Sequence, residues 1–160
     1  MATDYFLKLD DVKGESADSK HKGEIDITSF SWGETQSGSP LGGGHGTAKV
    51  TVQDLHFTHL IDKASPDLFK ICATGKHIPN GVLVARKAGD KPLEYLKIEM
   101  KDIMVTSIQV GGHGGGDSIP SEQVSLSFAS GKMIYTPQKA DGSGDTPADF
   151  KYDIKANKEG

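Results

Sequence analysis

The sequence has little cysteine and no excess of basic residues, and each shortage excludes a class of protein. Cys72 is the only cysteine among 160 residues, so no disulfide can form within the chain, and folding in a reducing cytoplasm is the simplest interpretation. Lysine and arginine number 18 against 22 acidic residues. This acidic balance argues against a nucleic-acid binder and against an electrostatic membrane anchor.

Long apolar runs are also missing. No segment approaches the roughly 18 consecutive apolar residues of a transmembrane helix, and Met1–Asp11 has neither the basic start nor the apolar stretch of a secretory signal peptide. We therefore expect no membrane insertion and no cleaved signal peptide, while export by another route stays open. With 35% hydrophobic and 25% charged residues, residues 1–160 have the composition of one globular domain.

The sequence does contain a repeated alternation of apolar and polar residues. Tyr5–Leu9 and Val124–Phe128 alternate at a period of two, which is typical of half-buried strands. The apolar phase shifts at Thr28–Ser29 and again at Gln53–Asp54, where we expect a bulge or a bend. Many short strands joined by glycine-rich turns predict a mainly β, antiparallel barrel or sandwich.

One segment predicts a short α-helix. Ser65 is a good N-cap, Pro66 fits the first helical position and Gly75 is a natural stop. Leu68, Phe69 and Cys72 form an apolar stripe at helical spacing. We expect this helix to cover one side or one end of the β structure.

Two predicted strands are apolar at both alternating positions, Val82–Ala85 and Ile103–Val105. An antiparallel strand with one face in the core and one in water should alternate, so something must cover the second face. The helix could do so, or a second subunit, and the pattern leaves both open. The candidates for a subunit interface are Val82, Val84, Ile103 and Val105.

We find no motif for catalysis or for cofactor binding. The two glycine-rich loops lack the G-x-x-x-x-G-K-[ST] and G-x-G-x-x-G patterns, and no serine lies in G-x-S-x-G. Six histidines raise the question of a metal. However, the closest pair, His56 and His59, would point to opposite sides of a strand and could not share an ion. We expect no enzymatic activity, no metal and no cofactor.

Eight blocks of the sequence, in order and with compatible spacing, resemble one family over nearly the whole chain. They are Phe6–Ser16, His21–Ile27, Ser29–Gly33, Gln36–Ser39, Ile61–Pro66, Thr74–His77, Arg86–Gly89 and Tyr135–Gly142. The sequence resembles the Hcp (haemolysin-coregulated protein) family, the tube proteins of the type VI secretion system. Many blocks in register are far more specific than any single motif.

The resemblance implies an antiparallel β-barrel with one short α-helix packed on its side, closing into a homohexameric ring. Rings stack into a hollow tube inside a contractile sheath, whose contraction expels the tube with a spike protein of the VgrG type at its tip. Effector proteins are carried or chaperoned in the lumen. Such a protein assembles in the cytoplasm and is then secreted without a cleaved signal peptide. A head-to-tail contact that closes by rotation makes such a ring.

The same resemblance implies two sets of site residues. Ser29 and Ser31 are candidates for the lumen and for effector binding, although on pattern alone Ser31 fits an ordinary exposed serine equally well. The loop Ser37–Gly46 resembles one that reaches the adjacent ring, with Leu41 as its apolar anchor. The ring-stacking candidates are Ser37, Gly38, Ser39, Leu41, Gly42, Gly43 and Gly44.

Two positions depart from the family's pattern. Gly131 stands where members usually carry an apolar strand residue, and Phe150–Ile154 lacks the tryptophan that is common there. Both changes concern strands that could set the stability of the ring.

Three alternatives remain at this stage. A ligand-binding barrel of the lipocalin type requires an enclosed apolar cavity. A small hydrolase or glycosidase requires two carboxylates about 5–9.5 Å apart that face a cleft. A tail tube protein of a phage-like particle shares the physics of assembly.

Overall fold

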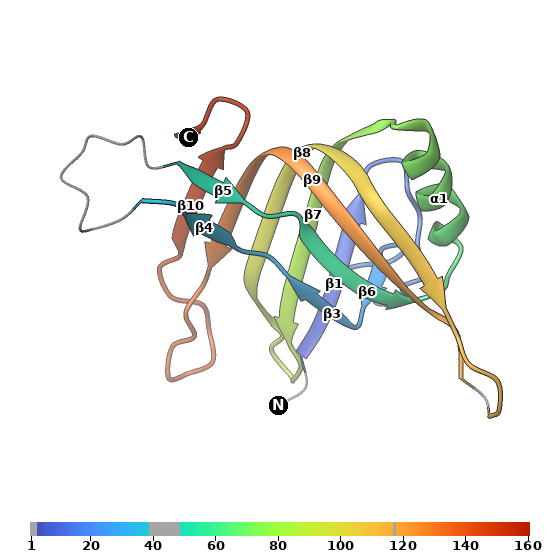
Figure 1. Cartoon of the computed structure of the whole chain (residues 1–160). Helices are drawn as coiled ribbons and strands as arrows, with labels where there is room; N and C mark the ends of the chain where they lie inside the picture. Colours follow the sequence, from blue (N-terminus) through green and yellow to red (C-terminus); the bar gives the residue numbers. More distant parts are fainter. Residues whose placement is uncertain (1–2, 39–48, 117) are drawn as a thin grey trace.

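Antiparallel strands curl around an apolar core, and α1 packs beside them, in a computed structural model that describes residues 3–38, 49–116 and 118–160 (Figure 1). The strands are β1 (Thr3–Leu9), β2 (Ile25–Ile27), β3 (Ser29–Ser31), β4 (Glu34–Gln36), β5 (Val50–Val52), β6 (Leu55–Leu60), β7 (His77–Lys87), β8 (Leu93–Gly111), β9 (Ser121–Tyr135), β10 (Ala148–Asp153) and β11 (Lys158–Glu159). The helix α1 spans Ala64–Thr74. The mainly β, antiparallel prediction is therefore confirmed.

The long strand β9 organises the sheet, because it pairs with three others. The main sheet has the order β11-β10-β9-β8-β7-β1-β2. The first half of β9 also pairs with β6, which in turn pairs with β3, and its second half pairs with β10. As a result, β3, β6, β9 and β8 lie side by side, although they come from distant parts of the chain.

The barrel prediction needs one correction. Among the described residues, no sheet closes into a barrel, since β2 stays with β1 while β3 pairs with β6. Thr28 lies between them, and its amide donates one hydrogen bond to the Thr58 carbonyl at 2.9 Å. This is the site of the predicted phase shift, and the break in alternation is what interrupts the ladder. The second predicted shift, at Gln53–Asp54, separates β5 from β6.

The helix ends where predicted but begins earlier. Gly75 has a left-handed backbone, with φ 67°, and ends α1. The prediction that Ser65 is the N-cap is wrong, because Ser65 is buried in the first turn and its hydroxyl accepts from the Asp62 amide at 3.1 Å. The Asp62 carboxylate accepts from the Ala64 amide at 2.9 Å and satisfies a free donor at the helix start. Within the described residues, no helix is long and apolar enough to cross a membrane.

Two of the four predicted interface residues belong to the core of the single chain. Ile103 and Val105 are 0% and 3% exposed and pack against other buried residues. Their side chains offer no surface to a second subunit, which corrects the interface prediction for these two positions. Met104 lies between them on the opposite face of β8 and is 36% exposed, so the second apolar position of this strand faces outward.

The chain itself covers the second face of β1 and β7. Phe6 and Val84 are cross-strand neighbours, and the segment Lys13–Glu24 lies over this face. From this segment, the His21 ring stacks on Phe6 with 4.2 Å between ring centroids. Neither the helix nor a subunit is needed to bury Val84, while Val82 remains partly exposed.

A buried arginine anchors this covering segment. Arg86, 8% exposed, donates to both carboxylate oxygens of Asp18, at 2.6 and 3.0 Å, and its guanidinium lies over the Phe6 ring at 4.9 Å. The hydrogen bonds from Arg86 hold the pKa of the Asp18 carboxyl well below its usual range. The sequence pattern could not predict this contact, because Asp18 and Arg86 lie 68 positions apart in the chain.

Packing within the chain explains why Gly131 stands where family members usually carry an apolar residue. Gly131 is buried on β9, opposite Met100 of β8 and Tyr152 of β10. The Phe128 ring, which packs on Trp32 with 5.6 Å between ring centroids, occupies the space above it. A Cβ added at Gly131 would lie 2.8 Å from Phe128 Cε2. A glycine is therefore required by the aromatic pair that covers this position.

We predict that Gly131→Ala destabilises the protein by about 1–3 kcal/mol, the usual cost of overpacking a core. The free energy of unfolding in urea measures this effect. Gly111→Ala, in β8, is the matched control, because an added Cβ there meets nothing within 4 Å. Equal stability of the two variants would contradict the packing argument.

We predict that the ion pair of Asp18 contributes to acid sensitivity. Because its pKa is lowered in the folded state, its contribution is present above the ordinary carboxyl pKa and is lost as the pH falls through the folded value. Asp18→Asn should therefore show a smaller loss of stability between about pH 7 and about pH 3 than the parent chain. Urea unfolding at both pH values tests this, with Asp26→Asn, an exposed carboxylate of β2, as the control. Parallel pH profiles of Asp18→Asn and the parent would refute it.

Candidate functional site

The outward face of four adjacent strands carries polar, uncharged side chains. Along β6, Leu55, Phe57 and His59 are buried on the core side. Strand alternation therefore turns His56 and Thr58 to the opposite side. The same alternation along β9 places Val124 and Leu126 in the core.

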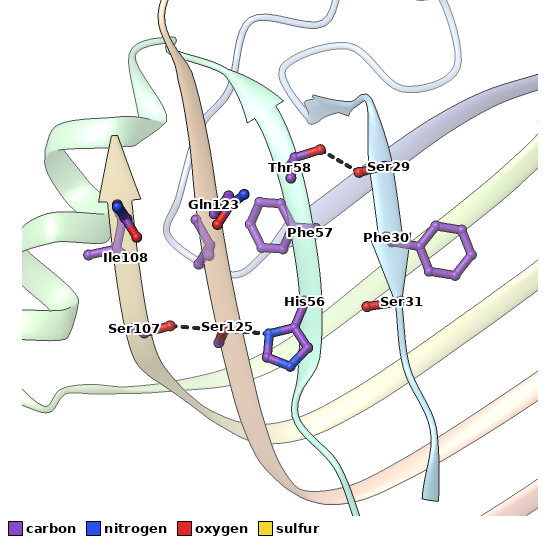
Figure 2. A pocket seen from close by; sticks show the side chains of 12 residues that line it. Ser29, Phe30, Ser31, His56, Phe57, Thr58, Ser107, Ile108, Gln123 and Ser125 are labelled. Carbon is purple, nitrogen blue, oxygen red and sulfur yellow. Dashed lines mark hydrogen bonds between the residues drawn. The ribbon is translucent and has the colours of Figure 1, made fainter. Parts of the chain in front are cut away.

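The register of the ladders aligns these outward residues into two rows across β3, β6, β9 and β8 (Figure 2). The first row is Ser31, His56, Ser125 and Ser107, and the second row is Ser29, Thr58, Gln123 and Gln109. We call these eight residues the polar rows. Residues directly opposite on paired strands are close enough for their side chains to bond.

Hydrogen bonds join neighbours within each row (Figure 2). In the first row, the Ser107 hydroxyl donates to Ser125 Oγ at 2.8 Å, and Ser125 Oγ lies 2.6 Å from His56 Nδ1. In the second row, Ser29 Oγ lies 2.5 Å from Thr58 Oγ1. Thr28 supports this contact, since its hydroxyl donates to the Thr58 carbonyl at 2.9 Å. These hydrogen bonds hold five of the eight side chains, Ser29, His56, Thr58, Ser107 and Ser125, to a neighbour in the same row.

The polar rows line a groove of about 370 Å³, together with Phe30, Phe57, Ile108 and Val124. Its lining includes no carboxylate and no ammonium group, and His56 is its one titratable residue. Hydroxyls and amides offer both donors and acceptors. The groove is therefore suited to bind a polar surface through hydrogen bonds rather than through charge.

The contact between His56 and Ser125 has the residue types of a nucleophile and its base. Catalysis would also need a group that orients the imidazole and donors for an oxyanion. Within the described residues, no hydrogen bond joins His56 Nε2 to a third side chain. Ser125 lies in mid-strand between β6 and β8, where the ladders on both sides use the backbone amides. The groove thus gives no support to a hydrolase, and its lining lacks the carboxylate pair of a glycosidase.

The predicted lumen residues and stacking residues lie apart. Ser29 and Ser31 are exposed on β3 and line the groove. Ser37 and Gly38 follow β4 and are exposed, and the Ser37 hydroxyl donates to the Lys49 carbonyl at 3.3 Å. The other stacking candidates, Ser39, Leu41, Gly42, Gly43 and Gly44, lie outside the described residues.

Sequence reasoning missed six members of the polar rows, which are His56, Thr58, Ser107, Gln109, Gln123 and Ser125. A partial signal was present for two of them, because His56 and Ser125 each lie between two buried apolar residues. Their assembly into rows depends on strand pairing, which periodicity does not reveal.

The two neighbouring histidines lie as predicted. His56 is exposed on the outer face and His59 is 0% exposed on the core side, so the pair cannot share a metal ion. In the part of the chain that the structure describes, no group of three histidine, cysteine or acidic residues is arranged to hold a metal.

Comparison with known proteins decides the family. Residues 6–135 match the model of the family described as "Type VI secretion system effector, Hcp". The chain is 49% identical over 160 residues to protein hcp1 of Pseudomonas aeruginosa, covering 98% of both chains. The chain belongs to the Hcp family.

Solved structures of Hcp proteins agree with this membership. The chain is similar to Hcp1 of Salmonella typhimurium, with 46% identity, a TM-score of 0.82 and 99% coverage of both chains. It is also similar to a structure described as a type six secretion system protein, with 29% identity and a TM-score of 0.91, over 99% of this chain and 100% of the other. The predicted family resemblance is confirmed.

Membership of the Hcp family makes the chain a tube protein of type VI secretion, a secreted structural component that assembles into oligomeric rings. The family match favours this function over two alternatives, a ligand-binding barrel of the lipocalin type and a tail tube protein of a phage-like particle.

Proposed function

We propose that six copies of the chain close into a ring whose bore is lined by the polar rows, and that effector proteins are carried there during secretion. The observation that carries this proposal is the pair of polar rows lining one groove, which includes Ser29, bonded to Thr58, and Ser31. A prearranged set of donors and acceptors binds a polar cargo surface at little entropic cost. The uncharged lining also allows release, because it forms no strong ion pairs.

The proposed ring uses surfaces other than the groove. Val82 is partly exposed on β7 and remains an interface candidate. Val84 is 5% exposed under the Lys13–Glu24 segment, so it would act only by supporting that segment. The exposed apolar residues Met104 and Tyr135 are further candidates, on β8 and β9.

We assign ring stacking to the two-stranded ribbon of β4 and β5. This ribbon extends away from the curled sheet (Figure 1). Ser37 and Gly38 lie at the outer end of β4, at the base of the stacking loop. A contact at the end of a projecting ribbon can reach a neighbour without disturbing the core.

The wider assembly follows from the type VI function. We infer that stacked rings lie inside a contractile sheath and carry a spike protein of the VgrG type. We also infer assembly in the cytoplasm, then secretion without a cleaved signal peptide. On this proposal the chain is not an enzyme and binds no nucleic acid, cofactor or metal.

The ring itself is tested by native mass spectrometry and by negative-stain images of the purified chain. We expect six-membered rings with an open centre. A protein that stays monomeric at high concentration would contradict the proposed assembly.

We predict that Ser31→Trp leaves rings intact but reduces, by about tenfold, the amount of effector that co-purifies with them from cells, a loss equivalent to about 1.4 kcal/mol of binding. The bulky ring would displace cargo from the groove. Ser19→Trp, at an exposed serine of the covering segment, is the control. Loss of rings in Ser31→Trp alone would show that position 31 lies at the subunit interface instead.

We predict that shortening the Ser37–Gly46 loop spares isolated rings and impairs their stacking. Images should show single rings where the parent chain forms stacks or tubes. Leu41→Ser, which removes the proposed apolar anchor, should weaken stacking to a smaller degree. Normal stacks from the shortened chain would refute the assignment of this loop.

A further inference from the structure

Four exposed lysines gather around one hollow beside the segment that covers β1 and β7. Lys13, Lys20 and Lys22 belong to the covering segment Lys13–Glu24, and Lys8 lies next to it on β1. All four line a hollow of about 550 Å³, which we call the lysine hollow. The whole chain carries a net charge of -4, so this concentration of positive charge is unusual for the protein.

The lysines of the hollow have no ionic partner inside the chain. In the part of the chain that the structure describes, the lysines that form ion pairs are Lys97 and Lys132, on β8 and β9. The ammonium groups around the hollow therefore repel one another without a carboxylate to offset the repulsion. A negatively charged partner would remove this repulsion and gain attraction from several lysines at once.

The carboxylates that also line the hollow do not cancel its charge. They are Asp10, Asp11 and Glu24, fewer than the four lysines. Two of them are engaged within the chain, since Asp10 accepts from the side-chain amide of Asn80 at 3.0 Å and Glu24 lies 2.9 Å from His21 Nδ1. The lysine hollow thus presents an excess of positive charge.

The backbone that carries the lysines is held in place by contacts on both sides. The Gly14 amide donates to the Gly23 carbonyl at 2.8 Å, and a Cβ added at Gly14 would collide with the Glu24 carbonyl. The buried Arg86 anchors the middle of the segment through Asp18. A partner that binds here therefore does not have to order the backbone, which lowers the entropic cost of binding.

The lysine hollow lies on a different side of the molecule from the polar rows. Leu7 and Leu9 of β1 and Leu55 and Phe57 of β6 fill the same core, and β1 lies behind β3 and β6 in the view of Figure 1. Alternation turns Lys8 away from this core on the β1 side. Because the proposed function places the polar rows at the bore, it places the lysine hollow on the outside of the ring.

We propose that the lysine hollow is the surface through which the tube contacts an acidic protein segment on its outside, which in the proposed assembly belongs to the surrounding sheath. This inference rests on the proposed function, because it requires that the polar rows line the bore. Exposed ion pairs are individually weak and are screened by salt. Such a contact holds the tube in place and still allows its expulsion.

The test uses assembled rings and a fluorescein-labelled poly-L-glutamate peptide as the probe. Fluorescence anisotropy gives its affinity at about pH 7.5, where glutamate and lysine are both ionised. The triple variant Lys13→Gln, Lys20→Gln and Lys22→Gln should bind the probe about tenfold more weakly at low ionic strength, with its rings intact. The affinity of the parent chain should fall as salt is added.

Two controls assign the binding to the lysine hollow. The triple variant Lys139→Gln, Lys155→Gln and Lys158→Gln loses the same charge at exposed lysines elsewhere, and its affinity should stay within about twofold of the parent's. Ser31→Trp narrows the proposed bore and should leave the affinity unchanged. Weaker binding by Ser31→Trp would place the probe in the bore and overturn the inference.

The remaining outcomes separate this inference from the proposed function. Equal affinities of the two triple variants, with intact rings, would overturn the role of the lysine hollow and leave the tube function standing. Loss of rings in the variant at residues 13, 20 and 22 would show that these lysines lie at a subunit contact, which also overturns the inference. A parent chain that forms no rings would overturn the proposed function and, with it, the outside position of the hollow.

Discussion

The alternation of side chains along β6 is the constraint on which the site depends. β6 pairs with β3 on one side and β9 on the other, so its register is fixed from both edges. Leu55, Phe57 and His59 fill the core while His56 and Thr58 face outward. A slip by one residue would turn the polar side chains inward and expose the apolar ones. The register that buries the core therefore also fixes which side chains line the groove.

A buried polar pair reinforces this register from the core side. His59 Nε2 lies 2.9 Å from Glu122 Oε1, and both side chains are 0% exposed. Because the two residues lie opposite each other on β6 and β9, a slip would separate them and leave a buried polar group unpaired. Asp62, near the helix start, lies 3.7 Å from the other nitrogen of His59, and burial raises the pKa of its carboxyl. Strand register and the start of α1 are thus coupled.

The two outer faces of the sheet serve different purposes. On β1 and β7, the segment Lys13–Glu24 covers Phe6 and Val84, and Arg86 anchors it through Asp18. On β3, β6, β9 and β8, the outward residues stay open and polar. Apolar residues on both phases of a strand thus do not by themselves indicate an interface, since a loop of the same chain can cover the second face. A polar outward face over a packed core leaves a surface free for transient contacts.

The sequence by itself determined the strand-rich class, both phase shifts, the helix stop at Gly75 and the Hcp family, because these depend on local periodicity, on single residues and on the order of motifs. Through the family resemblance it also predicted Ser29 and Ser31 as lumen residues, and both line the groove. Only the tertiary structure decided the polar rows, the burial of Ile103 and Val105, and the packing that requires Gly131. Each of these depends on which strands pair and in what register. The paired strands lie tens of residues apart in the sequence. Periodicity tells which side chains share a face of one strand, but it cannot tell which strands lie beside it.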